Sequence, residues 1–177
     1  MLIPPARRID HAKAGPRDKG IALRLRRDKG IALRLRRQTA VSTQANKRLI
    51  TRFYENMQNT QNLDLASELM AADVRFRGSL GRNMTGVDGW IDYQRSVYLA
   101  IPDFHNRIDE LVAEGDAVVA RLTYSGTHEG ELLGHPGTGR KISYAGVAIF
   151  HVRDGRISDG WVLGDLTGLL RQLEAAT

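Results

Sequence analysis

The stretch from Lys141 to Leu173 constrains the fold more than any other part of the chain. Its first part, residues 142–152, is rich in Val, Ile, Tyr and Phe, which predicts a strand buried on at least one face. Asp154-Gly155 then predicts a tight hairpin turn, because such turns require a positive φ that Gly and a few polar residues accept. A second strand is expected over residues 156–163, so the stretch predicts an antiparallel strand pair.

The end of this stretch predicts a C-terminal helix. Apolar positions recur at helical spacing over residues 166–173, and Asp165 stands just before them. An Asp side chain at that position can accept hydrogen bonds from the first N–H groups of a helix. Asp165 is therefore expected to cap the helix.

Small side chains predominate on one face of the two strands. The alternation of a strand groups Tyr144, Gly146, Ala148 and Phe150 on the first, and Ser158, Gly160 and Val162 on the second. A Gly inside a strand lowers stability and marks a bulge or a place where another group approaches the backbone closely. Two interpretations stay open: a concave face left free for a small molecule, or a bulge or close packing of a helix.

The net charge of +6 is unevenly distributed along the chain. Residues 1–40 hold 12 Lys+Arg and 3 Asp, giving +9, whereas residues 41–177 hold 14 Lys+Arg and 17 Asp+Glu, giving −3. The mildly acidic part gives no indication of nucleic-acid binding by the domain. No apolar run is long enough to cross a bilayer, so no membrane association is expected. The absence of Cys excludes disulfides and thiol chemistry and is compatible with a cytoplasmic protein.

The basic region contains a tandem duplication. The ten residues Arg17–Arg26, RDKGIALRLR, are repeated without change in Arg27–Arg36, and two such copies are too few to form a solenoid. Residues 1–42 are interpreted as a basic, disordered tail, and residues 43–177 as the domain. Three alternatives stay open: a true translation start near Val41, a basic arm for nucleic acid or anionic lipid, and a transit peptide, which the absence of Ser from residues 1–40 disfavours.

The rest of the domain predicts helices followed by strands. Leu49, Ile50, Phe53, Tyr54 and Met57 fall on one helical stripe. The further expected elements are a helix over 64–70, an extended piece over 74–77, a helix from about 86 that stops by 101 because Pro102 follows, and strands over 104–112 and 117–125. This order predicts an α+β fold, in which helices lie on the concave face of a curved antiparallel sheet and enclose a pocket.

A series of short motifs carries a resemblance to a known family. The motifs are Ile101-Pro102-Asp103-Phe104, Leu111-Val112-Ala113-Glu114-Gly115-Asp116, Gly126-Thr127-His128-Glu129-Gly130, Gly137-Thr138-Gly139-Arg140, Asp154-Gly155-Arg156-Ile157 and the run from Asp165 to Leu173. Together they resemble the SnoaL-like ester cyclase and polyketide cyclase family over about 46–173. The resemblance implies the cone-shaped α+β fold of nuclear transport factor 2, frequent dimerisation through the sheet, and cyclisation of a polyketide by an aldol reaction without metal or organic cofactor.

The family's catalytic residues do not carry over directly. With Asp154-Gly155-Arg156-Ile157 as the anchor, the cyclase's catalytic Asp falls on Val162 and its neighbouring His positions fall on Gly160 and Ala148. None of the three can transfer a proton. In the similar limonene-epoxide hydrolases an Asp-Arg-Asp set occupies the cone; Arg121 matches their Arg, but Thr123 and Val162 replace the acids.

An aldol cyclase needs a base and a donor that stabilises the enolate. We expect Asp165 as the base, bent inward by the last turn, with His128, Tyr144 or Arg121 as the donor. The expected ligand-binding residues are Arg121, Thr123, Tyr144, Tyr54 and Trp90. No metal site is expected, because the Gly-rich loop after His128 gives its His and Glu residues no fixed geometry.

The sequence therefore predicts a cofactor-free, SnoaL-like cyclase-type protein that binds a small hydrophobic carbonyl compound and forms a homodimer. The alternative is a non-catalytic binding or dimerisation module of the same fold, which the residues at positions 148, 160 and 162 favour.

Overall fold

The computed structural model describes residues 43–174. The expected basic tail over residues 1–42, with its duplication, lies outside them. None of the helices formed by residues 43–174 is long and apolar enough to cross a membrane.

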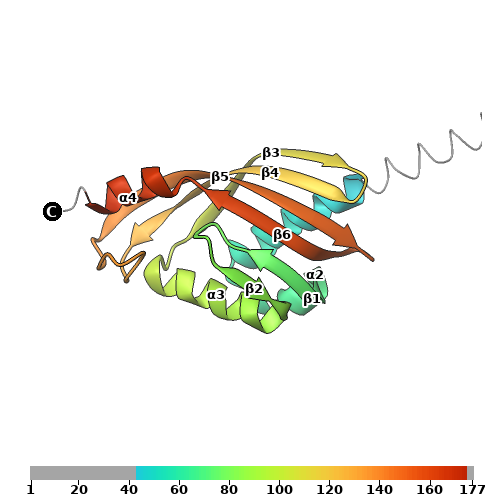
Figure 1. The fold of residues 1–177 in the computed structure, drawn as a ribbon, viewed down its shortest axis with the longest axis horizontal. Coiled ribbons are helices and arrows are strands. Elements are labelled where there is room, and N and C mark those ends of the chain that lie inside the picture. The colour runs from blue at the N-terminus through green and yellow to red at the C-terminus, as the bar shows by residue number, and fades with distance from the viewer. Residues whose placement is uncertain (1–42, 175–177) are drawn as a thin grey trace, which may run out of the picture. The chain divides into compact units, whose positions relative to one another are not determined.

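The described residues form an α+β domain (Figure 1). Residues 43–52 are α-helical and continue into a π-helical turn, η1. The elements that follow the α-helix are η1 (Phe53–Gln58), η2 (Leu63–Leu65), α2 (Ala66–Leu69), β1 (Met70–Arg77), β2 (Asn83–Thr85), α3 (Gly86–Ala100), β3 (His105–Glu114), β4 (Ala117–His128), β5 (Arg140–Arg153), β6 (Arg156–Gly164) and α4 (Leu166–Glu174). The predicted fold class is confirmed; the short strand β2 was not predicted.

The strands of this domain form one curved sheet in the order β2-β1-β6-β5-β4-β3. Neighbouring strands are antiparallel except β1 and β6, which are parallel. This is a departure from the purely antiparallel sheet that was expected. The two strands lie far apart in the sequence, so no hairpin turn forces them to run in opposite directions.

Helices cover one face of the sheet and leave the other open (Figure 1). On β4 the alternate residues Val118, Ala120, Leu122 and Tyr124 are buried toward the helices. The core centres on Phe53, whose ring centroid lies 5.0 Å from that of Tyr54 and 5.5 Å from those of Trp90 and Phe150. Edge-to-face and tilted aromatic pairs of this kind stabilise a core beyond the area that they bury.

Three glycines of the inner face are covered by aromatic rings. A Cβ added at Gly146 would lie 2.3 Å from the Tyr124 ring, one at Gly160 would lie 2.4 Å from the Phe76 ring, and one at Gly78 would lie 2.3 Å from the Tyr93 ring. Phe76 and Gly160 are direct cross-strand partners. Gly146 and Gly160 thus point inward, but rings from neighbouring elements fill the space over them, so the face is not left free for a small molecule. Ser158, which the alternation placed on the same face, lies instead at a bulge between Ile157 and Asp159.

Helix α4 completes the edge of β5 beyond the point where β6 ends. The Asp165 carboxylate accepts a hydrogen bond from Gly168 N (2.9 Å), so the predicted cap is confirmed. The Gln172 side chain accepts from Ser143 N (2.9 Å) and donates to Ser143 O (2.8 Å). The amide of Gln172 therefore pairs with the backbone of β5 as a further strand would.

We predict opposite effects from two Gly→Ala substitutions. Gly146→Ala should destabilise the domain by about 1–3 kcal/mol, because the new methyl group overlaps the Tyr124 ring. Gly89→Ala, inside α3 and 3.9 Å from its nearest neighbour, should stabilise it by about 0.5–1 kcal/mol through helix propensity. Urea unfolding of both variants measures the two changes. Equal stability of the two variants would contradict close packing of the Tyr124 ring on Gly146.

Candidate functional site

A small cavity lies between the helices and the inner face of the sheet. Its volume is ≈ 30 Å³, which is the space of one or two water molecules rather than of an organic ligand. Its lining combines phenols, amides and apolar side chains: Tyr54, Gln58, Phe76, Gly78, Ser79, Tyr93, Gln94, Val97, Phe104, Asn106, Tyr124 and Val162.

The π-helical turn brings Tyr54 and Gln58 to this cavity. Asn59 N donates to Tyr54 O and Asn62 N donates to Met57 O, each at 2.9 Å, and both bonds span five residues as in a π-helix. Within this one turn Tyr54, Met57 and Gln58 are all buried. The wider turn thus directs a phenol and an amide to the same interior.

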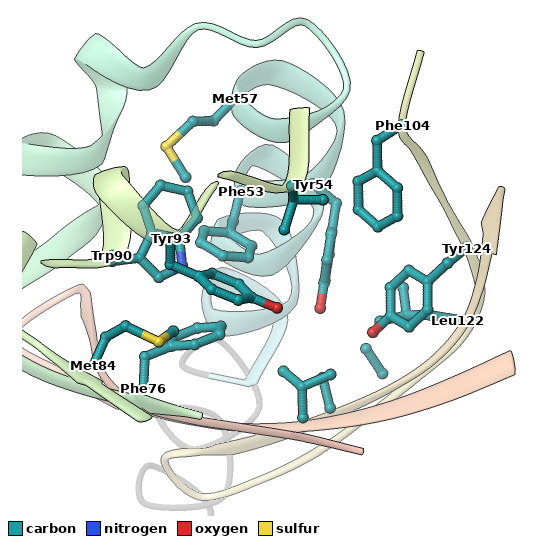
Figure 2. Close-up of a cluster of buried hydrophobic side chains, with 14 of the residues drawn as sticks. Phe53, Tyr54, Met57, Phe76, Met84, Trp90, Tyr93, Phe104, Leu122 and Tyr124 are labelled. Atoms are coloured by element: carbon teal, nitrogen blue, oxygen red, sulfur yellow. The ribbon is translucent and has the colours of Figure 1, made fainter. Parts of the chain in front are cut away.

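Three tyrosine hydroxyls converge on the cavity from different elements. Figure 2 shows the oxygens of Tyr54, from η1, Tyr93, from α3, and Tyr124, from β4, directed toward the same central space. Tyr144 lies next to Tyr124, with its ring 5.0 Å from that of Tyr124 and its hydroxyl 3.4 Å from Ser79 Oγ. The cavity therefore holds a cluster of phenols from separate parts of the chain.

Burial keeps these phenols protonated. It raises the pKa of Tyr54 well above its ordinary value, with a further contribution from the Tyr124 phenol. Burial also raises the pKa of Tyr93, Tyr124 and Tyr144, and it raises the pKa of the half-buried Tyr98 to about 12. At neutral pH the cluster consists of hydrogen-bond donors.

Three buried amides complete the lining. Asn106 is held by Asn59, whose Oδ1 accepts from Asn106 N (2.8 Å) and Nδ2 (3.1 Å). The backbone carbonyl of Gln58 accepts from the Tyr98 hydroxyl (2.8 Å). Gln94 Nε2, by contrast, is buried without a hydrogen-bond partner among residues 43–174.

The lining can polarise a carbonyl but contains no strong base. It has phenol and amide donors and no carboxylate, imidazole, ammonium or guanidinium group. Val162, onto which the family's catalytic Asp was aligned, lines the cavity. Ala148 and Gly160, onto which the His positions were aligned, are also buried.

Three of the expected ligand-binding residues are buried on the helix side of the sheet. Tyr54 lines the cavity, whereas Tyr144 and Trp90 are buried next to it and are not part of its lining. The Trp90 ring packs between Phe53 and Phe76, at 5.5 and 6.2 Å. Its Nε1 is buried and has no hydrogen-bond partner within the described part of the chain.

The expected placement of Arg121 and Thr123 in the cone is corrected by the structure. Both residues lie on the outer face of β4, where Thr123 Oγ1 donates to Asp109 (2.8 Å) and Arg121 pairs with Asp109 and Glu110. Successive side chains of a strand point to opposite faces of the sheet. The apolar residues of β4 face the helices, so Arg121 and Thr123, which alternate with them, face outward.

The two expected catalytic residues do not line the cavity. Asp165 is exposed and its carboxylate caps α4, so it does not turn inward. His128 is fully buried at the end of β4; its Nδ1 lies 3.1 Å from Thr138 Oγ1, and none of the described residues gives its Nε2 a hydrogen-bond partner. Over residues 43–174 no three or more His, Asp or Glu side chains are grouped to hold a metal ion.

Sequence reasoning missed most of the lining, including Tyr93, Gln94 and Tyr124. One signal was available: Gln58 follows Tyr54 by four residues, and Gln94 follows Trp90 by four. A polar side chain at that spacing lies on the buried stripe of its helix. Buried glutamines of this kind need a hydrogen-bond partner, which marks the interior that they face.

A family model and a curated protein both match most of this chain. Residues 48–173 match the family of SnoaL-like polyketide cyclases. The aklanonic acid methyl ester cyclase DnrD from Streptomyces peucetius is 30% identical over 141 residues, which cover 75% of this chain and 92% of that protein.

Solved structures share the fold. A protein from Jannaschia sp. CCS1 superposes with a TM-score of 0.70 at 20% identity, over 75% of this chain and 94% of that one. IdmH from Streptomyces antibioticus superposes with a TM-score of 0.64 at 30% identity, over 73% of this chain and 98% of that one.

We predict that the tyrosines ionise only when the domain unfolds. All five tyrosines of the chain have a raised pKa, so the stability that they contribute is present below about pH 10 and is lost as the pH rises further. An alkaline titration followed by tyrosinate absorbance should coincide with loss of the circular dichroism signal. Ionisation of several tyrosines at pH 10 in the folded protein would contradict this prediction.

Proposed function

Because the chain belongs to the SnoaL-like polyketide cyclase family, as its sequence resemblance predicted, we propose that the cavity binds a small hydrophobic carbonyl compound and promotes an aldol-type cyclisation or isomerisation. The observation that carries this proposal is the convergence of three buried phenols in a lining without charged groups. Neutral donors in a water-poor cavity stabilise negative charge that develops on a carbonyl oxygen.

The proposed reaction balances without a cofactor. The carbon next to one carbonyl loses a proton and bonds to the carbon of a second carbonyl, whose oxygen gains a proton. Tyr54, Tyr93 and Tyr124 supply donors to that oxygen. Since the lining holds no strong base, the proposal favours substrates such as 1,3-dicarbonyl compounds, whose acidic C–H or preformed enol needs little assistance.

Binding of such a substrate requires the rings over the glycines to move. Organic ligands occupy pockets of about 300–1,000 Å³, far more than the ≈ 30 Å³ of this cavity. The rings of Tyr124, Phe76 and Tyr93 fill the space above Gly146, Gly160 and Gly78. Rotation of these rings would open the interior without deforming the sheet.

A second function is supported by the absence of a carboxylate at Val162. A protein that retains the donors and lacks the family's base can bind a carbonyl compound without converting it. The two functions are distinguished by turnover: a cyclase converts the carbonyl compound that it binds, whereas a binding protein does not.

We also propose that the protein is a cytoplasmic homodimer that associates through the open sheet face. Val119, Ile149 and Trp161 form one cross-strand row on this face, and Val147 and Leu163 lie side by side in the next. The Trp161 side chain is 40% exposed and Leu163 is 50% exposed, which is unusual for large apolar residues of a strand.

We predict that Tyr124→Phe lowers turnover of aklanonic acid methyl ester, the compound in the name of the Streptomyces peucetius relative. Loss of one donor should lower kcat by about tenfold to a hundredfold, while the ring that covers Gly146 is retained. Product formation by the full-length protein is measured by chromatography.

Asp165→Asn is the control for this experiment and should retain turnover, because Asn also caps helices. Loss of turnover in Asp165→Asn, with full activity in Tyr124→Phe, would instead assign the catalytic base to Asp165. Binding of the compound without turnover by the wild-type protein would support the non-catalytic alternative.

We predict that Trp161→Glu converts the homodimer to a monomer, because a charge then lies in the apolar row of the sheet face. Leu99→Glu is the matched control: Leu99 is 78% exposed but lies on α3, and its substitution should leave the dimer intact. Sedimentation velocity measures both. A monomeric wild-type protein would refute the proposed assembly.

A further inference from the structure

The Gln94 side chain has an unsatisfied donor inside the cavity. Gln94 lies in α3, four residues after Trp90, and is 3% exposed. It lines the cavity, and its Nε2 has no hydrogen-bond partner in the part of the chain that the structure describes. Buried amide groups are normally paired, so an unpaired one at a cavity indicates a bound acceptor.

The neighbouring phenol can satisfy at most one of the two N–H groups of this amide. Burial is the main cause that raises the pKa of Tyr98, and hydrogen bonding by the Gln94 side chain acts in the opposite direction, so the Gln94 amide lies beside the Tyr98 hydroxyl. The Tyr98 hydroxyl nevertheless donates to Gln58 O (2.8 Å), and no acceptor meets Gln94 Nε2 with hydrogen-bond geometry. The donor thus stays available to a molecule in the cavity.

The surrounding groups define the chemistry of that molecule. Phenols of Tyr93 and Tyr124 line the same cavity, and Phe76, Val97 and Phe104 form its apolar walls. No cation in the lining would balance a carboxylate or phosphate, and no anion would balance an amine. A neutral oxygen acceptor on an apolar carbon skeleton fits this lining.

We infer that Gln94 is a specificity-determining residue whose Nε2 donates a hydrogen bond to a carbonyl oxygen of the ligand. The inference rests on the proposed function and deepens it, because it assigns the recognition of the carbonyl to an amide on α3 in addition to the phenols. A site built to donate to an oxygen rejects an analogue that lacks it, since the amide is then left buried and unpaired.

The test measures binding of two compounds by the full-length protein with isothermal titration calorimetry. Benzoylacetone carries a 1,3-dicarbonyl group, and butylbenzene is a hydrocarbon of similar shape. The wild-type protein should prefer benzoylacetone. Gln94→Met, which keeps the length of the side chain and removes the donor, should weaken benzoylacetone binding about tenfold and leave butylbenzene binding unchanged.

Two further measurements separate this role from a structural one. Gln94→Met should leave the ligand-free Tm unchanged or raised, because it removes an unpaired buried donor. In the ¹⁵N-labelled wild-type protein, one Gln side-chain NH₂ resonance should shift with benzoylacetone and not with butylbenzene. Gly89→Ala, on the same helix and outside the lining, should bind both compounds as the wild type does.

The failures are distinguishable. A wild-type protein that binds neither compound overturns both the proposed function and this inference. Binding of benzoylacetone with an undiminished preference in Gln94→Met overturns the inference alone. A lower Tm in Gln94→Met, with no Gln resonance that responds to benzoylacetone, also overturns it and assigns the amide to a bound water only.

Discussion

The contact of aromatic rings with backbone glycines determines the interior of this domain. Gly146, Gly160 and Gly78 leave room on the inner face, and the rings of Tyr124, Phe76 and Tyr93 occupy it at a closeness that no Cβ would allow. Each ring offsets the packing that a strand or strand end loses at a glycine. The same contact aims two phenols at the cavity, so the packing of the sheet and the chemistry of the site have one origin.

This origin explains why the cavity is rich in donors and poor in bases. Tyr54, Tyr93 and Tyr124 are buried for packing, and burial raises their pKa, so they donate and do not accept protons at neutral pH. A carboxylate at Val162 would be surrounded by these rings and would be costly to ionise. The proposed chemistry therefore depends on polarising a carbonyl of a substrate that gives up its proton easily.

Local patterns in the sequence predicted the elements well and the site poorly. The Asp154-Gly155 turn, the Asp165 cap and the alternation of β4 depend on neighbouring residues, and the structure confirms each of them. The lining of the cavity depends on which elements meet, and η1, α3 and β4 come together only in the folded domain. A strand with small residues also gives no sign that a ring from another element will cover it, as Phe76 covers Gly160.

Hydrogen bonds fix η1 and the Asn106 amide at the cavity, whereas the Phe76 ring is a movable part. Asn59 binds both the backbone N–H and the side chain of Asn106, and Tyr98 binds the carbonyl of Gln58, so η1 is tied to β3 and to α3. These bonds hold the Asn106 amide and the backbone of η1 in place before a ligand arrives, which lowers the free energy of reorganisation on binding. The phenyl ring of Phe76 has no such bond. A ligand that displaces this ring therefore replaces one apolar contact with another, and the hydrogen bonds that tie η1 to β3 and α3 stay in place.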